Sequence, residues 1–264
     1  MNAIILAGGQ GNRLKPLTNN QPKCLVELFG KSLLNWQLDI FQKLKINDIS
    51  IVKGYLQEQI TFPNINFYEN KNYETTNMIE TLFCARDKIS DSTIISYGDI
   101  IYEESVLEKL IKNNDDISLI IDKNWKDYWS SRLDDPISDL ESLSIDSENN
   151  ILSIGQKIEN ISEIQGQYIG LMKFQNTGSE VLKSFYDKCK SYAENGKNYL
   201  KTDISFEKSY MTDLLQGMID EGYKIRAIPI NNGWLELDSY NDYLKYQKMF
   251  ENETISKFFN PYTS

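Results

Sequence analysis

The chain has 264 residues, enough for one large or two small domains, and a chain of this length buries about 70 to 75% of its unfolded surface. Hydrophobic residues make up 41% and charged residues 25%, with 14 glycines and 6 prolines, which excludes a disordered or fibrous protein. The 28 basic and 38 acidic residues give a formal net charge of -10, which argues against a nonspecific nucleic-acid binder or a protein held on an anionic membrane.

Short apolar runs recur along the chain and predict strands, with amphipathic stretches typical of helices between the early ones. Strands that alternate with helices favour crossover connections and a mainly parallel sheet. We therefore expect an α/β, Rossmann-like fold, with a mixed but mainly parallel sheet flanked by helices. The predicted strands are 3–6, 49–52, 93–97, 118–121, 168–174 and 225–230, and the predicted early helices are 33–44 and 78–88.

The regularity weakens over residues 122–165, where polar residues dominate and turn residues are frequent. We interpret this region as an inserted, β-rich lid or acceptor-binding region within a single domain that spans 1–264. A helix over 206–221 and a strand over 234–237 are predicted after it. Ser239, followed three residues later by Asp242, resembles a capping box and predicts the start of a last helix.

Histidine is absent, and the three cysteines are far apart in the sequence. The lack of histidine excludes a Ser-His-Asp triad, a Cys-His dyad and histidine metal ligands. Cys24, Cys84 and Cys189 form no CxxC motif, so free and mostly buried thiols are expected. The chain starts without a basic segment and has no apolar run near 18 residues, which favours a cytoplasmic protein without a membrane span.

A glycine-rich segment follows the first predicted strand. It reads Leu-Ala-Gly-Gly-Gln-Gly-Asn-Arg-Leu over 6–14, then Pro-Leu-Thr over 16–18 and Pro-Lys over 22–23. Glycines let a backbone approach a ligand closely and turn its N–H groups toward a phosphate. The segment is not a P-loop, because no Lys-Ser or Lys-Thr pair follows a glycine at the required spacing. It matches a dinucleotide fingerprint poorly, because Leu14 stands where a small residue is needed.

The 6–23 segment resembles the signature of the nucleotidyltransferase (pyrophosphorylase) family, which condenses an NTP with a phosphorylated metabolite. The resemblance implies that Arg13 and Lys23 hold the triphosphate. Looser matches extend it to 52–55 and 70–82, where Gly54 is equally interpreted as a turn and Asn77 as a helix cap. The implied nucleotide-binding residues are Leu6, Ala7, Gly8, Gly9, Gly11, Asn12, Gly54, Tyr55, Thr76 and Asn77.

The same resemblance implies catalysis with Mg²⁺ held by two carboxylates. Asp99 follows the predicted strand 93–97, at the strand end where ligands bind in open α/β sheets. Asp238 ends the predicted strand 234–237. Two oxygen ligands supplemented by water and phosphate suit Mg²⁺. A different interpretation of Asp238 is an acidic residue that only stabilises a helix N-terminus.

The acceptor region departs from the sugar-phosphate branch of the family. That branch carries Glu-Lys-Pro, whereas this chain has Gln-Lys-Ile at 156–158, so the lysine, Lys157, lacks its acidic partner. The whole pattern is more similar to cytidylyltransferases that activate small headgroups such as phosphocholine, aminoalkylphosphonates or phosphoglutamine. The resemblance implies acceptor contacts from Lys157, Gln167 and Tyr168.

Four residues within the insertion are spaced to lie on one helix face: Trp125, Tyr128, Trp129 and Arg132. Aromatic rings there would suit an ammonium group, and Arg132 would suit a carboxylate or phosphate, so Trp125, Trp129 and Arg132 are candidate acceptor contacts. The alternative is that these side chains pack the helix onto the protein core.

The expected reaction transfers CMP from CTP to a small phosphorylated or phosphono headgroup, for surface polysaccharide or phosphonate modification, with release of pyrophosphate. The attacking oxygen is already ionised at pH 7, so no general base is required in a chain without histidine. Two alternatives stay open: a sugar-1-phosphate nucleotidyltransferase, and a regulatory subunit with the same fold. Regulatory subunits commonly lose the loop cations or the metal carboxylates, and this chain keeps all four.

Overall fold

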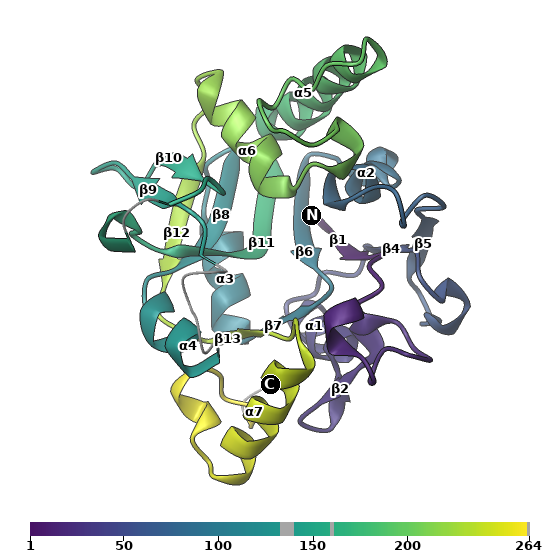
Figure 1. The fold of residues 1–264 in the computed structure, drawn as a ribbon, viewed down its shortest axis with the longest axis vertical. Helices are drawn as coiled ribbons and strands as arrows, with labels where there is room; N and C mark the ends of the chain where they lie inside the picture. The colour runs from purple at the N-terminus through teal and green to yellow at the C-terminus, as the bar shows by residue number, and fades with distance from the viewer. Residues whose placement is uncertain (133–139, 159–160, 263–264) are drawn as a thin grey trace.

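A seven-stranded sheet forms the centre of the molecule (Figure 1), which we describe from a computed structural model covering residues 1–132, 140–158 and 161–262. The six predicted strands from 3–6 to 225–230 are all present in this sheet. The sheet also contains β5, an edge strand that lacks an apolar run because its side chains are mostly exposed. In sheet order the strands are β12 (Arg226–Ile230), β8 (Ile117–Asp122), β11 (Gln167–Gln175), β6 (Ser92–Tyr97), β1 (Asn2–Ala7), β4 (Ile49–Lys53) and β5 (Asn66–Glu69).

Most neighbours in the sheet are parallel, as the sequence predicts, but β11 is antiparallel to both β6 and β8. The reason lies in the insertion. It leaves the sheet at the end of β8 and returns at the same edge, since Gln167 at the start of β11 pairs with Asp122 at the end of β8. The chain therefore runs back along β8 without a crossover. The sheet is mixed and mainly parallel.

Helices cover both faces of the sheet and divide the core in two. Ala3 and Ile5 of β1 face one core, which includes side chains of α1 (Leu33–Lys43), α3 (Glu104–Lys112) and α4 (Trp125–Arg132). Ile4 and Leu6 face the other, with α2 (Met78–Phe83), α5 (Thr177–Glu194) and α6 (Met211–Asp220). This alternation follows from the two-residue period of a strand, and burial on both faces explains why the central strands read as continuous apolar runs.

Two predicted helices are shorter than expected, and two helices were not predicted. The 78–88 stretch is α2 followed by a 3-10 turn at Arg86–Lys88, and the 206–221 stretch begins with a 3-10 turn at Phe206–Lys208 before α6. The amphipathic helices α3 and α5 form in stretches for which no element is predicted. The predicted start of the last helix is confirmed, because Ser239 and Asp242 form a capping box at α7 (Tyr240–Glu251).

Three small two-stranded sheets complete the fold. The hairpin of β9 (Leu143–Ile145) and β10 (Ile151–Ile154) lies in the region interpreted as an insertion, as does α4. The others pair β2 (Glu27–Leu28) with β3 (Lys31–Ser32), and β7 (Ile100–Tyr102) with β13 (Trp234–Glu236). Within the described ranges, no helix is long and apolar enough to cross a membrane.

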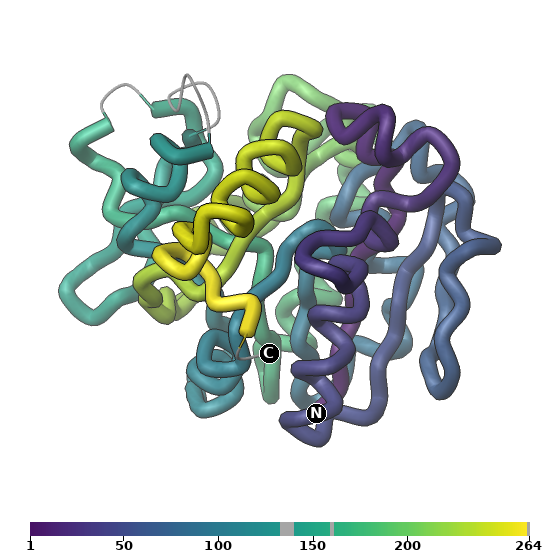
Figure 2. Tube along the Cα trace, turned by 90° about the horizontal axis from the view of Figure 1, so that it is seen from below, coloured from purple at the N-terminus to yellow at the C-terminus, as the bar shows by residue number. Residues whose placement is uncertain are grey.

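Helix α7 brings the end of the chain back to its beginning. Figure 2 shows this helix in yellow beside the purple loop that follows β1, and the two segments are in contact. The pairing of β7 with β13 brings the segment before α7 to the centre of the molecule. As a result, residues from both ends of the sequence lie next to the strand ends of the main sheet.

Candidate nucleotide-binding site

The glycine segment after β1 is held by backbone contacts with two neighbouring strand ends. The N–H of Tyr55 donates to the carbonyl of Gly8 at 3.2 Å, and the N–H of Gly98 donates to the carbonyl of Leu6 at 2.9 Å. A Cβ atom at Gly54 would lie 2.5 Å from the Gly8 oxygen, and one at Gly98 would lie 2.7 Å from the Leu6 oxygen. Only glycine fits at these two approaches, so Gly54 does more than form a simple turn.

The loop then folds back toward Lys23. Gly11 has a left-handed backbone with φ of 64°, and its carbonyl accepts a hydrogen bond from the Thr18 hydroxyl at 2.8 Å. A Cβ atom at Gly11 would lie 3.0 Å from Cβ of Lys23, so the two segments touch. The side chain of Arg13, on the 3-10 turn that follows Gly11, is 70% exposed and reaches Asp238 at 2.6 Å.

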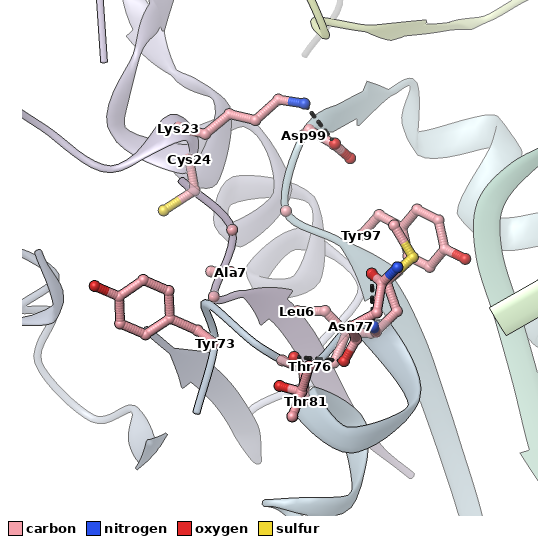
Figure 3. A pocket seen from close by; sticks show the side chains of 14 residues that line it. Leu6, Ala7, Lys23, Cys24, Tyr73, Thr76, Asn77, Thr81, Tyr97 and Asp99 are labelled. Carbon is pink, nitrogen blue, oxygen red and sulfur yellow. Dashed lines mark hydrogen bonds and ion pairs between the residues drawn. The ribbon is translucent and has the colours of Figure 1, made fainter. Parts of the chain in front are cut away.

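A hollow opens beside this loop, and Figure 3 shows its lining. Six of the ten predicted nucleotide-binding residues line it, while Gly11, Asn12, Gly54 and Tyr55 lie on the adjoining loops. Asn77 also caps α2, because its side-chain oxygen accepts from the N–H of Met78 at 2.9 Å. The lining residues are Leu6, Ala7, Gly8, Gly9, Lys23, Cys24, Tyr73, Thr76, Asn77, Met78, Thr81, Tyr97, Gly98 and Asp99.

Lys23 joins the two predicted metal-binding aspartates at one edge of the hollow. Its Nζ atom lies 2.7 Å from Oδ2 of Asp99 and 2.9 Å from Oδ1 of Asp238. The link to Asp99 is drawn in Figure 3. Burial alone would lower the pKa of the Lys23 ammonium, but Asp99, Asp238 and Glu236 outweigh it and raise that pKa above its ordinary value. Lys23 is thus a fully charged counter-ion to this carboxylate cluster.

Strand pairing explains how Asp99 and Asp238 meet, although they are 139 residues apart in the sequence. Strand β13 runs antiparallel to β7, with Glu236 opposite Ile100, and the N–H of Leu237 donates to the carbonyl of Asp99 at 2.9 Å. Burial opposes ionisation of Asp238, yet Lys23 and Arg13 hold the pKa of its carboxyl below the usual range. All four predicted catalytic residues therefore lie together.

Glu236 is a site residue that was not predicted. Its carboxylate joins those of Asp99 and Asp238 in a group whose ligand atoms lie within 4.8 Å of one another. Burial, followed by repulsion from Asp238 and Asp99, raises the pKa of Glu236 to about 7, with Arg132 acting in the opposite direction. The available signal was spacing, because residues two apart on a strand point to the same face.

The carboxylate cluster suits a divalent cation that prefers oxygen ligands. Oδ1 of Asp99 is buried and has no hydrogen-bond partner among the described residues, so this oxygen is available as a metal ligand. Mg²⁺ in proteins is commonly held by one or two carboxylates plus water and substrate phosphates. The residues present therefore fit the predicted metal, with Asp99 and Asp238 as ligands.

A second hollow adjoins the first and shares Met78 and Tyr97 with it. Three predicted acceptor-binding residues line it: Trp129, Gln167 and Tyr168. Gly170 has a φ of 85°, and a Cβ atom there would lie 2.5 Å from the Tyr97 ring, so this glycine makes room for the ring that separates the hollows. The other lining residues are Glu141, Ile169, Gly170, Tyr210, Thr212, Trp234 and Glu236.

Three other predicted acceptor contacts lie elsewhere. Trp125 is 3% exposed and packs in the core, so the face of α4 mainly packs the helix down. Arg132 is 1% exposed, and its guanidinium is bound to carboxylates of the protein itself. Lys157 lines a separate hollow in the β9–β10 region of the insertion. The spacing identifies the buried face of α4, but it does not show whether such a face packs in the core or lines a ligand site.

Residues 3–133 match the MobA-like NTP transferase domain. The chain is 35% identical over 253 residues to the CTP:phosphoglutamine cytidylyltransferase of Campylobacter jejuni, covering 92% of this chain and 97% of the relative. The chain belongs to the nucleotidyltransferase family. A second nucleotidyltransferase, the choline-phosphate cytidylyltransferase of Streptococcus pneumoniae, is 26% identical over 96% of this chain and its own full length.

Solved nucleotidyltransferases share the fold. The CTP:phosphocholine cytidylyltransferase of Streptococcus pneumoniae superposes with a TM-score of 0.71 at 21% identity, covering 94% of this chain and 98% of the other. The inositol-1-phosphate CTP transferase of T. maritima gives a TM-score of 0.68 at 22% identity, covering 95% and 96%. The expected Rossmann-like sheet of this nucleotidyltransferase is confirmed.

Proposed function

We propose that the protein transfers CMP from CTP to a small phosphorylated acceptor and releases pyrophosphate. The observation that carries the proposal is the placement of Lys23, Asp99 and Asp238 at one edge of a hollow lined by the glycine segment. The relative at 35% identity, a CTP:phosphoglutamine cytidylyltransferase, supports CTP as the donor.

The chain supplies charge and orientation to this reaction. An acceptor phosphate oxygen attacks the α-phosphorus of CTP as the bond to pyrophosphate breaks, and it needs no general base because it is ionised at pH 7. Lys23 and Arg13 stabilise the negative charge of the triphosphate and of the departing pyrophosphate. Mg²⁺ held by Asp99 and Asp238 would neutralise further phosphate charge. The backbone at Gly8 and Gly9 would let the nucleotide approach closely.

The second hollow is the proposed acceptor site. Its lining includes two acidic residues, Glu141 and Glu236, and two aromatic residues, Trp129 and Tyr168, a combination that suits an ammonium group. We therefore propose a headgroup that carries an amino group as well as its phosphate, of the phosphoglutamine, aminoalkylphosphonate or phosphocholine type. The activated headgroup would serve surface polysaccharide or phosphonate modification, in the cytoplasm where CTP is available.

The test is a screen for pyrophosphate release with CTP, UTP, ATP and dTTP against phosphoglutamine, phosphocholine, 2-aminoethylphosphonate and glucose-1-phosphate. We expect CTP with an amino-bearing acceptor to give the highest kcat/KM, and EDTA to abolish turnover. An Asp238→Asn variant, assayed in parallel, shows whether the activity belongs to this site. Higher kcat/KM with a hexose phosphate and UTP or dTTP would instead establish a sugar nucleotidyltransferase, and no turnover with any pair would favour a regulatory subunit.

A further inference from the structure

Arg132 is a buried cation surrounded by three carboxylates from different elements. It ends α4, and its side chain is 1% exposed. The guanidinium donates to Glu236 on β13, and through Nε to Oδ1 of Asp242 on α7 at 3.0 Å. Its third nitrogen lies 3.9 Å from Oδ2 of Asp238. Arg132, on a helix of the insertion, thus contacts the carboxylate cluster that Lys23 also contacts.

Asp242 extends this contact to the backbone. Its Oδ2 accepts hydrogen bonds from the N–H of Asp238 at 3.2 Å and from the N–H of Ser239 at 2.7 Å, and the side chain is fully buried. Arg132 therefore holds the side chain of Glu236 directly and the backbone of Asp238 through Asp242. A planar guanidinium with several fixed donors is suited to holding two carboxylates at a set angle, which a lysine ammonium is not.

We propose that Arg132 is a positioning residue, which fixes Glu236 and Asp238 beside Asp99 in the geometry that binds the metal and the nucleotide phosphates. The inference rests on the proposed function of this site. Carboxylates whose ligand atoms lie within 4.8 Å of one another repel, and the buried Arg132 guanidinium beside them offsets that repulsion. The role replaces the acceptor contact predicted for Arg132.

The arrangement also connects the two hollows. Trp129, one turn before Arg132 on α4, lines the acceptor hollow, and the Arg132 guanidinium lies 5.8 Å from the centre of its ring. The same helix therefore contributes an aromatic wall to the acceptor site and the cation that orients the carboxylates. A substitution at Arg132 is expected to act on metal affinity more than on nucleotide selection.

The experiment compares Arg132→Lys with Arg226→Lys. Arg226 makes a similar pair with Asp115, at 3.0 and 3.2 Å, but on β12 and away from both hollows. Mn²⁺ binding is measured by electron paramagnetic resonance in the presence of CTP and without acceptor, together with the melting temperature. Removing a group that orients metal ligands typically weakens metal binding by about 10- to 100-fold. We expect that loss in Arg132→Lys and unchanged Mn²⁺ binding in Arg226→Lys.

Turnover gives a second readout. If the defect of Arg132→Lys is weaker metal binding, a high Mg²⁺ concentration should restore much of the wild-type kcat. A folded Arg132→Lys protein that binds Mn²⁺ as tightly as the wild type overturns the proposal. If that variant does not fold, Asp242→Asn decides in the same way, with a smaller loss expected because its amide oxygen still accepts from Ser239. The two proposals can fail separately. A wild-type protein that is inactive in the acceptor screen would disprove the proposed function. The Mn²⁺ comparison would stay valid, because metal binding is measured without turnover.

Discussion

At the scale of single residues, Lys23 is the most constrained cation in the site. Its ammonium lies 2.7 Å from Asp99 and 2.9 Å from Asp238, the two carboxylates expected to bind the metal. In the protein without ligands, the Lys23 ammonium therefore competes with a metal ion for these two carboxylates. With nucleotide bound, the same charge is available to the triphosphate.

Lys23→Met is expected to have two effects. Pyrophosphate release should fall by about 10²-fold or more, the usual scale for losing a charge-stabilising donor. Mn²⁺ binding without nucleotide should become tighter, because the competing ammonium is gone. Both are measured on the purified protein, the first by steady-state kinetics and the second by titration.

The matched control for this prediction is Lys31→Met. Lys31 pairs with Asp39 at 2.6 Å on the surface, so its removal changes the formal charge equally but touches no part of the site. The control should leave both readouts at the wild-type level. Wild-type turnover in Lys23→Met would contradict the assigned role of Lys23.

At the scale of elements, the loops after β1 and β4 approach each other so closely that a side chain is excluded. A Cβ atom on Gly54 would lie 2.5 Å from the Gly8 carbonyl oxygen and 2.9 Å from Cβ of Tyr73, whereas one on Gly9 would have no neighbour within 4 Å. Gly54→Ala must therefore displace backbone. It should lower the free energy of unfolding by about 1–3 kcal/mol, as other overpacking substitutions do.

Urea unfolding followed by circular dichroism measures this difference, with Gly9→Ala as the comparison. We expect Gly9→Ala to unfold near the wild-type urea midpoint and Gly54→Ala at a clearly lower one. Equal midpoints for the two variants would show that the loops separate easily, and Gly54 would then be an ordinary turn residue.

At the scale of the whole molecule, burial controls the chemistry of the thiols. Cys24 lines the nucleotide hollow and Cys189 lies on α5, and burial is the main cause that raises the pKa of each thiol to about 12. An unfolded cysteine has a pKa of about 8.5, so at pH 8 unfolding both exposes these thiols and allows them to ionise. Their reaction with a thiol reagent therefore reports global opening.

In a Cys84→Ser variant, which leaves only these two thiols, Ellman's reagent at pH 8 should react slowly with the native protein and rapidly in denaturing urea. Because the pKa of each native thiol is raised, a reaction in the folded chain should keep rising about tenfold per pH unit from pH 7 to 9, whereas the reaction in urea should level off above the unfolded pKa of about 8.5. Equal rates with and without urea would mean that the two cysteines are accessible in the folded chain.

Much of the fold and of the nucleotide site is determined by short stretches of sequence. The buried strands are continuous apolar runs, and the capping box at Ser239 is complete within four residues. The glycine segment and Lys23 lie within 18 residues, counted from 6 to 23, so the motif and its chemistry are readable without a fold. Asp99 was identifiable in the same way, because it directly follows a strand.

Only the tertiary structure decided which distant side chains meet. The pairing of β13 with β7 brings Asp238 and Glu236 to Asp99, and the packing of α4 turns Arg132 toward the carboxylates. Lys157 lies at another hollow. The reversed direction of β11 was likewise invisible in its apolar run. Hydrophobic periodicity and helix capping depend on residues that are close in the sequence. The contacts of the carboxylate cluster depend instead on strand register and helix packing between distant segments. Arg132 and Asp242, for example, are more than 100 residues apart.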